Sequence, residues 1–176
     1  MRRAKSPGCR DMSFARVLKH LFSTRWRVRQ HFTPAVLDEI EAAIRDVESR
    51  HSGEIRFVVE AALDGDELWR GLAPRARALE VFSHLGVWDT ANNNGVLIYV
   101  LFADRDVEIV ADRGIAARVS REEWEQVCRE IEAHYREGRF ARGSVAGIRA
   151  VGTLLERHFP GHGADADELP NQPVLL

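Results

Sequence analysis

Hydrophobic and polar positions follow two different periods along this chain, and these periods divide it into helices and strands. Apolar residues recur at helical spacing in four segments: 34–51, 74–85, 120–137 and 142–158. Thr33 and Pro34 provide an N-cap and a favourable first-turn residue for the first segment. Ser120 and Glu123 form a capping box at the start of the third. The pattern therefore predicts at least four helices with defined starting points.

Three shorter segments have the patterns of strands. Residues 54–62 and 106–112 alternate between apolar and polar positions, whereas 95–102 is apolar throughout, which is typical of a strand covered on both faces. A helix separates the first two strands, so we expect a right-handed parallel crossover between them. Residues 103–105 are short enough for a hairpin turn to an antiparallel third strand. The order predicts an α/β fold, a three-layer α/β/α sandwich around a small mixed sheet.

Charge divides the 176-residue chain into a basic leader and an acidic body. Residues 1–30 hold nine Lys or Arg and one acidic residue, about +8, which leaves 16 basic against 26 acidic residues, about −10, for residues 31–176. We assign 31–160 to one domain and 161–176 to a polar tail whose apolar end, 174–176, is expected to dock on the body. An acidic body repels phosphates, so no specific nucleic-acid interface is expected.

The leader does not have the pattern of a secretory signal or a membrane helix. Its apolar residues are split by Lys19 and His20, and the longest apolar run of the chain is 95–103. Cys9 and Cys128 do not form a disulfide framework, so a reducing compartment is expected. We therefore expect a cytoplasmic protein, with a peripheral position at the inner membrane as the alternative. Residues 14–26 are basic and amphipathic, which favours weak contact with anionic membrane; the competing interpretation is a loosely docked leader.

Strand direction predicts that acidic residues gather at two opposite edges of the sheet. The carboxyl ends of the parallel strands carry Asp64, Asp66, Glu67 and Asp104, and this is the edge where open α/β sheets usually bind ligands. The opposite edge carries a richer set of oxygen ligands, and its candidate metal ligands are Glu54, Asp89, Asn93 and Asp112. Such ligands suit Ca²⁺ or another divalent cation. The alternative is that the Asn-rich loop, residues 89–94, only forms turns and caps backbone groups.

Several motifs carry a resemblance to a known family. They are GEIRFVVE, the segment RARALEVFSHLGVWDTANNNGVLIYVLFADRDVEIVADRG, W-x-x-V-C, F-A-R-G-x-x-x-G-I and HFP. Across about residues 32–160 they resemble the TPM-domain family, most closely its short bacterial members without signal peptide or membrane helix. The resemblance implies an α/β/α sandwich and divalent-cation binding, usually of Ca²⁺, near the N-G-V-L step at 94–97. It also implies acid phosphatase activity in some plant members, but no phosphatase nucleophile motif is present in this sequence.

Three hypotheses for the function follow. The first is a module that binds a divalent cation and acts in maintenance with a membrane-associated protein partner. The second is a metal-assisted phosphatase that hydrolyses phosphate monoesters. The third is a structural scaffold docked on anionic membrane through residues 14–26.

Overall fold

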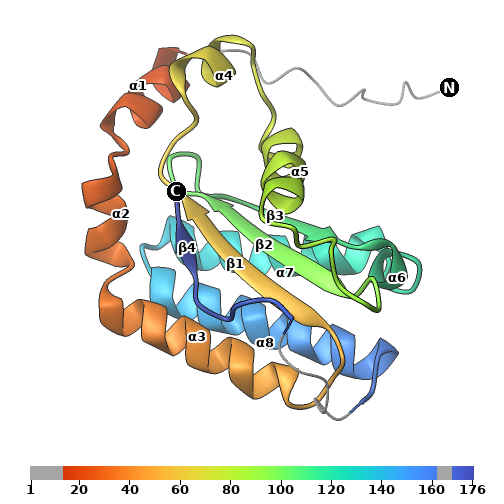
Figure 1. The fold of residues 1–176 in the computed structure, drawn as a ribbon. Coiled ribbons are helices and arrows are strands. Elements are labelled where there is room, and N and C mark those ends of the chain that lie inside the picture. Colours follow the sequence, from red (N-terminus) through yellow and green to blue (C-terminus); the bar gives the residue numbers. More distant parts are fainter. Residues whose placement is uncertain (1–13, 162–167) are drawn as a thin grey trace, which may run out of the picture.

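The computed structural model describes residues 14–161 and 168–176, which fold around a four-stranded mixed sheet (Figure 1). The strand order is β3-β2-β1-β4, with β1 at Glu54–Glu60, β2 at Gly95–Leu101, β3 at Asp106–Ala111 and β4 at Val174–Leu175. β1 runs parallel to both β2 and β4, and β3 pairs antiparallel with β2. The predicted crossover and hairpin are therefore confirmed, and the apolar end of the chain adds a fourth strand.

Helices cover both faces of the sheet, as the three-layer prediction requires (Figure 1). Their bounds are α1 Phe14–Phe22, α2 Arg25–His31, α3 Pro34–Glu48, α4 Gly65–Trp69, α5 Pro74–His84, α6 Arg113–Ala116, α7 Arg121–Arg136 and α8 Phe140–His158. Helices α3, α7 and α8 lie on one face, with α8 in contact with both of the others, and α5 lies on the opposite face.

The two sides of the sheet have separate hydrophobic cores. Ile55, Phe57 and Val59 of β1 face the larger core under α3, α7 and α8. Val58 of β1 and Leu97 of β2 face the smaller core under α5. Every residue of β2 is buried, because this central strand is covered from both sides. This explains why its sequence is apolar without alternation.

Some element boundaries differ from the sequence-based expectation for local reasons. α3 ends at Glu48 rather than near residue 51, and α8 begins at Phe140 rather than Arg142. The sequence pattern does not predict the short helix α4, which begins with a capping box in which the backbone N–H of Asp64 donates to the Glu67 carboxylate at 2.9 Å.

The part of the leader that the structure describes forms the two helices α1 and α2. His20 and Val28 are buried against the body, whereas residues 1–13 lie outside the described residues. Each helix in the described part of the chain is too short or too polar to span a bilayer.

Candidate functional site

The candidate metal ligands predicted from the sequence lie at the edge of the sheet where β1 and β2 begin, here called the amino-end edge. Two of them, Glu54 and Asp112, lie on either side of Gly95, the first residue of β2. Glu54 pairs with Gly95 in the parallel ladder, and its N–H donates to the carbonyl of Asn94 at 3.0 Å. On the other side, the N–H of Asp112 donates to the carbonyl of Gly95 at 2.8 Å. Glu54, Asn94 and Asp112 therefore lie at the ends of three adjacent strands, at the edge that strand direction predicts.

Two glycines allow the Asn-rich loop to pack closely against this edge. A Cβ on Gly95 would lie 1.9 Å from the carbonyl oxygen of Val87, and one on Gly114 would lie 2.6 Å from that of Asn93. Asn93 adopts a left-handed backbone conformation, with a φ of 52°, which Asn tolerates better than most residues. Its carbonyl accepts a hydrogen bond from Gly114 N at 3.1 Å. The loop is thus fixed against the first turn of α6.

Asn94 and Asp112 each bury one oxygen atom without a hydrogen bond. Asn94 is 5% exposed, and its amide nitrogen donates to the Ser52 carbonyl. Asp112 is 6% exposed and caps α6, with Oδ1 accepting from Arg113 N at 2.6 Å. Within the described part of the chain, Asn94 Oδ1 and Asp112 Oδ2 have no hydrogen-bond partner. Since an unsatisfied buried polar atom costs about 1–3 kcal/mol, these oxygens are candidates for contact with a cation or water.

The remaining candidate ligands are used in other ways. Asp89 is exposed, and its N–H donates to the Gly86 carbonyl. Asn93 Oδ1 accepts from the Arg113 guanidinium at 3.3 Å, so a positive charge already faces this amide. One oxygen of Glu54 accepts from Leu169 N at 3.3 Å, which connects the site to the tail of the chain.

The oxygen atoms of this edge suit a hard cation in type, although the edge does not hold a preassembled carboxylate cluster. Within residues 14–161 and 168–176, no group of three or more His, Cys, Asp or Glu side chains is arranged to hold a metal ion. Calcium accepts amide, backbone and water oxygens as well as carboxylates. Asp112 Oδ2 and Asn94 Oδ1 are therefore the atoms here that fit such an ion. The sequence-based ligand set omitted Asn94, although its position beside Gly95 in the N-G-V-L step could have identified it.

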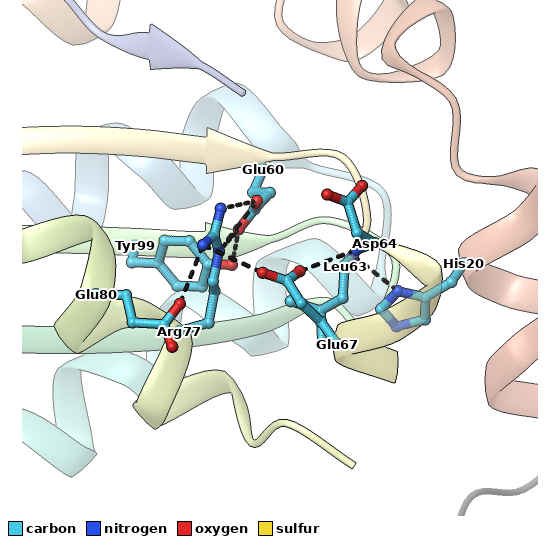
Figure 2. A network of polar contacts seen from close by, with 8 residues as sticks. All are labelled: His20, Glu60, Leu63, Asp64, Glu67, Arg77, Glu80 and Tyr99. Carbon is cyan, nitrogen blue, oxygen red and sulfur yellow. Dashed lines mark hydrogen bonds and ion pairs between the residues drawn. The ribbon is translucent and has the colours of Figure 1, made fainter. Parts of the chain in front are cut away.

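The opposite edge holds an ionic network in which a single guanidinium, that of Arg77, contacts three carboxylates around the buried Glu60 (Figure 2). The Arg77 guanidinium donates to both oxygens of Glu60, at 2.8 Å from Nη2 and 3.0 Å from Nε, and the Tyr99 hydroxyl donates to the same carboxylate. Arg77 also lies 3.3 Å from Glu67 and 3.1 Å from Glu80. Burial, followed by the charge of Glu60, raises the pKa of Tyr99. This network stabilises the fold and leaves no carboxylate oxygen of Glu60 without a donor.

Three of the four acidic residues predicted for this edge also have structural partners, whereas Asp66 is exposed. Asp64 and Glu67 cap α4, and Asp104 contacts Arg16 and His20 of α1. Their pairing explains why the edge that usually binds ligands is less suited to do so here.

A groove of about 600 Å³ runs along β3. Trp124 and Cys128 of α7 line it together with acidic and basic side chains. Burial, with further contributions from Glu108 and Glu132, raises the pKa of the Cys128 thiol to about 12. A thiol with this pKa is protonated at neutral pH, so Cys128 is not an activated nucleophile.

Comparison with known proteins agrees with this architecture. The sequence profile of the TPM domain matches residues 28–154. The chain belongs to the TPM-domain family. The match begins within α2, so helix α1 precedes the region that this family's profile describes.

Solved structures with the same fold include the BA42 protein of the psychrophilic bacterium Bizionia argentinensis. It is 35% identical to this TPM protein, with a TM-score of 0.72, over 82% of this chain and 94% of that one. The N-terminal domain of a protein from P. gingivalis is 22% identical, with a TM-score of 0.58, over 74% and 82%. The N-terminal domain of the cg2496 protein of Corynebacterium glutamicum is 14% identical, with a TM-score of 0.52, over 78% of each chain. The latter two show the fold alone, and no curated protein matches the sequence.

Proposed function

We propose that this TPM domain binds a divalent cation, Ca²⁺ foremost, at the amino-end edge of its sheet. The observation that carries the proposal is Asp112 Oδ2, a buried carboxylate oxygen without a hydrogen-bond donor among the described residues. Asn94, which immediately precedes the neighbouring strand β2, likewise has a buried oxygen, Oδ1, without a hydrogen-bond donor among the described residues. A cation would compensate both oxygens, with Asn93, Glu54 and the exposed Asp89 as the other candidate ligands and water completing its shell.

The position of Arg113 predicts that such binding is weak. Its guanidinium donates to Asn93 Oδ1 at 3.3 Å, so it competes with a cation for this oxygen and repels it electrostatically. Replacement of Arg113 by Gln removes the charge from the same location. We therefore expect R113Q to bind Ca²⁺ several-fold more tightly than the wild type.

Calcium titration followed by NMR and by thermal shift tests the proposal. Asp112→Asn is the decisive variant, because Asn is as good an N-cap as Asp and removes only the charge. We expect the wild type to show saturable shifts around residues 89–94 and 112–114 at millimolar Ca²⁺, and D112N to lose them. Asp38→Asn, which changes an exposed carboxylate on α3, is the matched control and should titrate as the wild type does. No shift in the wild type, or equal shifts in D112N, would contradict the proposal.

We further propose that the domain acts as a binding or maintenance module with a membrane-associated protein partner in the cytoplasm. Cys128, a free cysteine, is compatible with a reducing compartment.

The alternative function is that of a phosphatase. In it, Asp112 would hold the cation, and the cation would activate water as a Lewis acid. Hydrolysis of an aryl phosphate by the wild type, and its loss in D112N, would favour that alternative. Hydrolysis that persists in D112N would place any activity outside this edge.

A further inference from the structure

Helix α1 is attached to the body by its polar side. Arg16 and His20, one turn apart, both face the turn between β2 and β3, where Arg16 Nη2 lies 2.8 Å from Asp104 Oδ2 and His20 Nε2 lies 3.3 Å from Oδ1. His20 Nδ1 also accepts a hydrogen bond from Leu63 N at 3.0 Å, as Figure 2 shows. His20 is the one buried residue of this helix. In an ordinary surface helix the apolar stripe faces the core, so the orientation of α1 is reversed.

The apolar side of α1 consequently faces outward. Phe14, Leu18, Leu21 and Phe22 recur at helical spacing, and Phe14, Leu21 and Phe22 are 65–78% exposed. Trp26 of α2, at 68%, continues this set of exposed side chains along the chain. Five of the eight large exposed hydrophobic residues in the described chain therefore fall within residues 14–26. Concentrated exposure of this kind marks an interaction site rather than scattered surface variation.

The charged side chains of α1 and α2 are all basic. Residues 14–31 contain five Lys or Arg and no acidic residue. Arg16 is paired with Asp104, which leaves Lys19, Arg25, Arg27 and Arg29, all exposed, around the apolar side chains. Aromatic and leucine side chains bordered by Lys and Arg are the composition of helices that lie in a membrane interface. The long basic side chains can extend to lipid phosphates while the apolar groups enter the acyl boundary.

We propose that α1 and the start of α2 form a docking surface for a bilayer that carries anionic lipids. Such a bilayer can bury the apolar side chains in its acyl region and pair the surrounding Lys and Arg side chains with lipid phosphates. A second copy of this chain would have to bury several arginines that have no acidic partner among the described residues, and charged residues are depleted at the centres of protein interfaces. The surface is separate from the proposed cation site: Asp104 follows the end of β2, whereas Asn94 and Gly95 lie at its start.

Co-sedimentation of the full chain with vesicles tests this proposal. The stripe variant, Phe14→Ser with Leu21→Ser and Phe22→Ser, alters only exposed side chains. The charge variant, Arg25→Gln with Arg27→Gln and Arg29→Gln, retains the apolar side chains. Trp88→Ser is the matched control, because Trp88 is 52% exposed but precedes β2, at the opposite edge of the sheet. Circular dichroism of each variant should match the wild type.

We expect the wild type and W88S to sediment with phosphatidylglycerol-containing vesicles and not with pure phosphatidylcholine vesicles. The stripe variant should bind at least ten-fold more weakly, as should the charge variant, and salt should weaken binding of the wild type. D112N should bind as the wild type does, which separates this proposal from the cation site. Absence of wild-type binding, or equal binding by the stripe variant, would overturn it. So would self-association that depends on the stripe residues without vesicle binding, which would assign the surface to a second copy.

Discussion

His20 Nε2 lies 3.3 Å from Asp104 Oδ1, so a helix that precedes the sheet is attached to a turn at the far end of its central hairpin. Because Nδ1 of the same ring accepts from Leu63 N, a neutral ring carries its proton on Nε2, the nitrogen nearer to the carboxylate. Arg16 completes the contact from the preceding turn of the helix. Helix α1 is therefore held by electrostatic and hydrogen-bonding contacts.

Asp104 should make stability depend on pH. Burial alone would raise the pKa of Asp104, but hydrogen bonds and charges from His20 and Arg16 outweigh burial and lower it. A carboxylate with a lowered native pKa stabilises the fold above its unfolded pKa of about 3.9, and this stabilisation is lost as pH falls through the native value. We expect Asp104→Asn to reduce the free energy of unfolding by about 1–3 kcal/mol at pH 7. Urea denaturation should show this difference shrinking as the pH is lowered below about 4.

Asp38→Asn serves as the control for this measurement, since Asp38 is exposed on α3. It should leave stability unchanged within about 0.5 kcal/mol. If the difference in free energy of unfolding between the wild type and D104N stays constant as the pH is lowered, the charge of Asp104 does not stabilise the fold.

Loss of the Glu60 carboxylate should destabilise the protein much more than loss of the Tyr99 hydroxyl that donates to it. Glu60→Ala leaves Arg77 and the buried Tyr99 hydroxyl without their shared acceptor, so we expect a loss of about 3–5 kcal/mol. Tyr99→Phe removes one hydrogen bond and should cost about 0.5–1.5 kcal/mol. Equal losses, measured by denaturation at pH 7, would show that the carboxylate is not the centre of the network.

The raised pKa of Tyr99 also predicts that the free energy of unfolding decreases at alkaline pH. Burial and the adjacent Glu60 charge raise the pKa of Tyr99, so the native state keeps a proton that the unfolded state releases above pH of about 10. Stability of the wild type should fall as pH rises through this range. Tyr99→Phe should fall less steeply, and parallel curves for the two proteins would refute this linkage.

Cys128 should react slowly with thiol reagents. With a pKa of about 12, its thiolate fraction at pH 8 is about a thousand-fold below that of an ordinary exposed cysteine. In a Cys9→Ser variant, the remaining thiol should label with a disulfide reagent only slowly under native conditions, and rapidly once urea unfolds the chain. Rapid labelling of the native variant would show that α7 leaves the thiol accessible and ionised.

Gly147 should tolerate no side chain without repacking of α7 against α8. A Cβ at this position would lie 2.3 Å from Ile131 Cδ1 and 2.5 Å from its Cγ1. We expect Gly147→Ala to lower the free energy of unfolding by about 1–3 kcal/mol, although alanine favours a helix. Gly65→Ala is the control, because open space surrounds that Cβ. Addition of Ile131→Val to G147A should cost less than the sum of the two single changes, whereas simple additivity would contradict direct contact.

The sequence predicts the sheet well because its strands carry strong local patterns. β2 is covered on both faces, and its seven apolar residues indicate this directly. β4 could not be predicted as a strand, because two residues are too few to show an alternating pattern. Its pairing with Val58 and Val59 depends on tertiary contact. For the same reason, the amphipathic pattern of α1 identifies a helix but not which side faces the body. That choice depends on Asp104, which lies far away in sequence.

The candidate site shows the same division between topology and side-chain placement. Strand direction correctly places Glu54 and Asp112 on either side of the start of β2. It does not show that Arg113 reaches Asn93, nor that Asp89 is exposed, since loop side chains depend on close packing at Gly95 and Gly114. The role of these residues as cation ligands stays a prediction.

The glycines of α8 change how the family resemblance should be understood. Gly143 and Gly147 are the two glycines of F-A-R-G-x-x-x-G-I, and both lie where α7 side chains, Tyr135 and Ile131, approach the helix backbone. Part of the sequence pattern on which the resemblance rests thus reflects how closely two helices approach in this protein. A chain could retain these glycines, and with them the architecture, while its edge loops diverged in chemistry. Members of the family can accordingly share a scaffold and differ in activity, and each activity has to be established from its own loops.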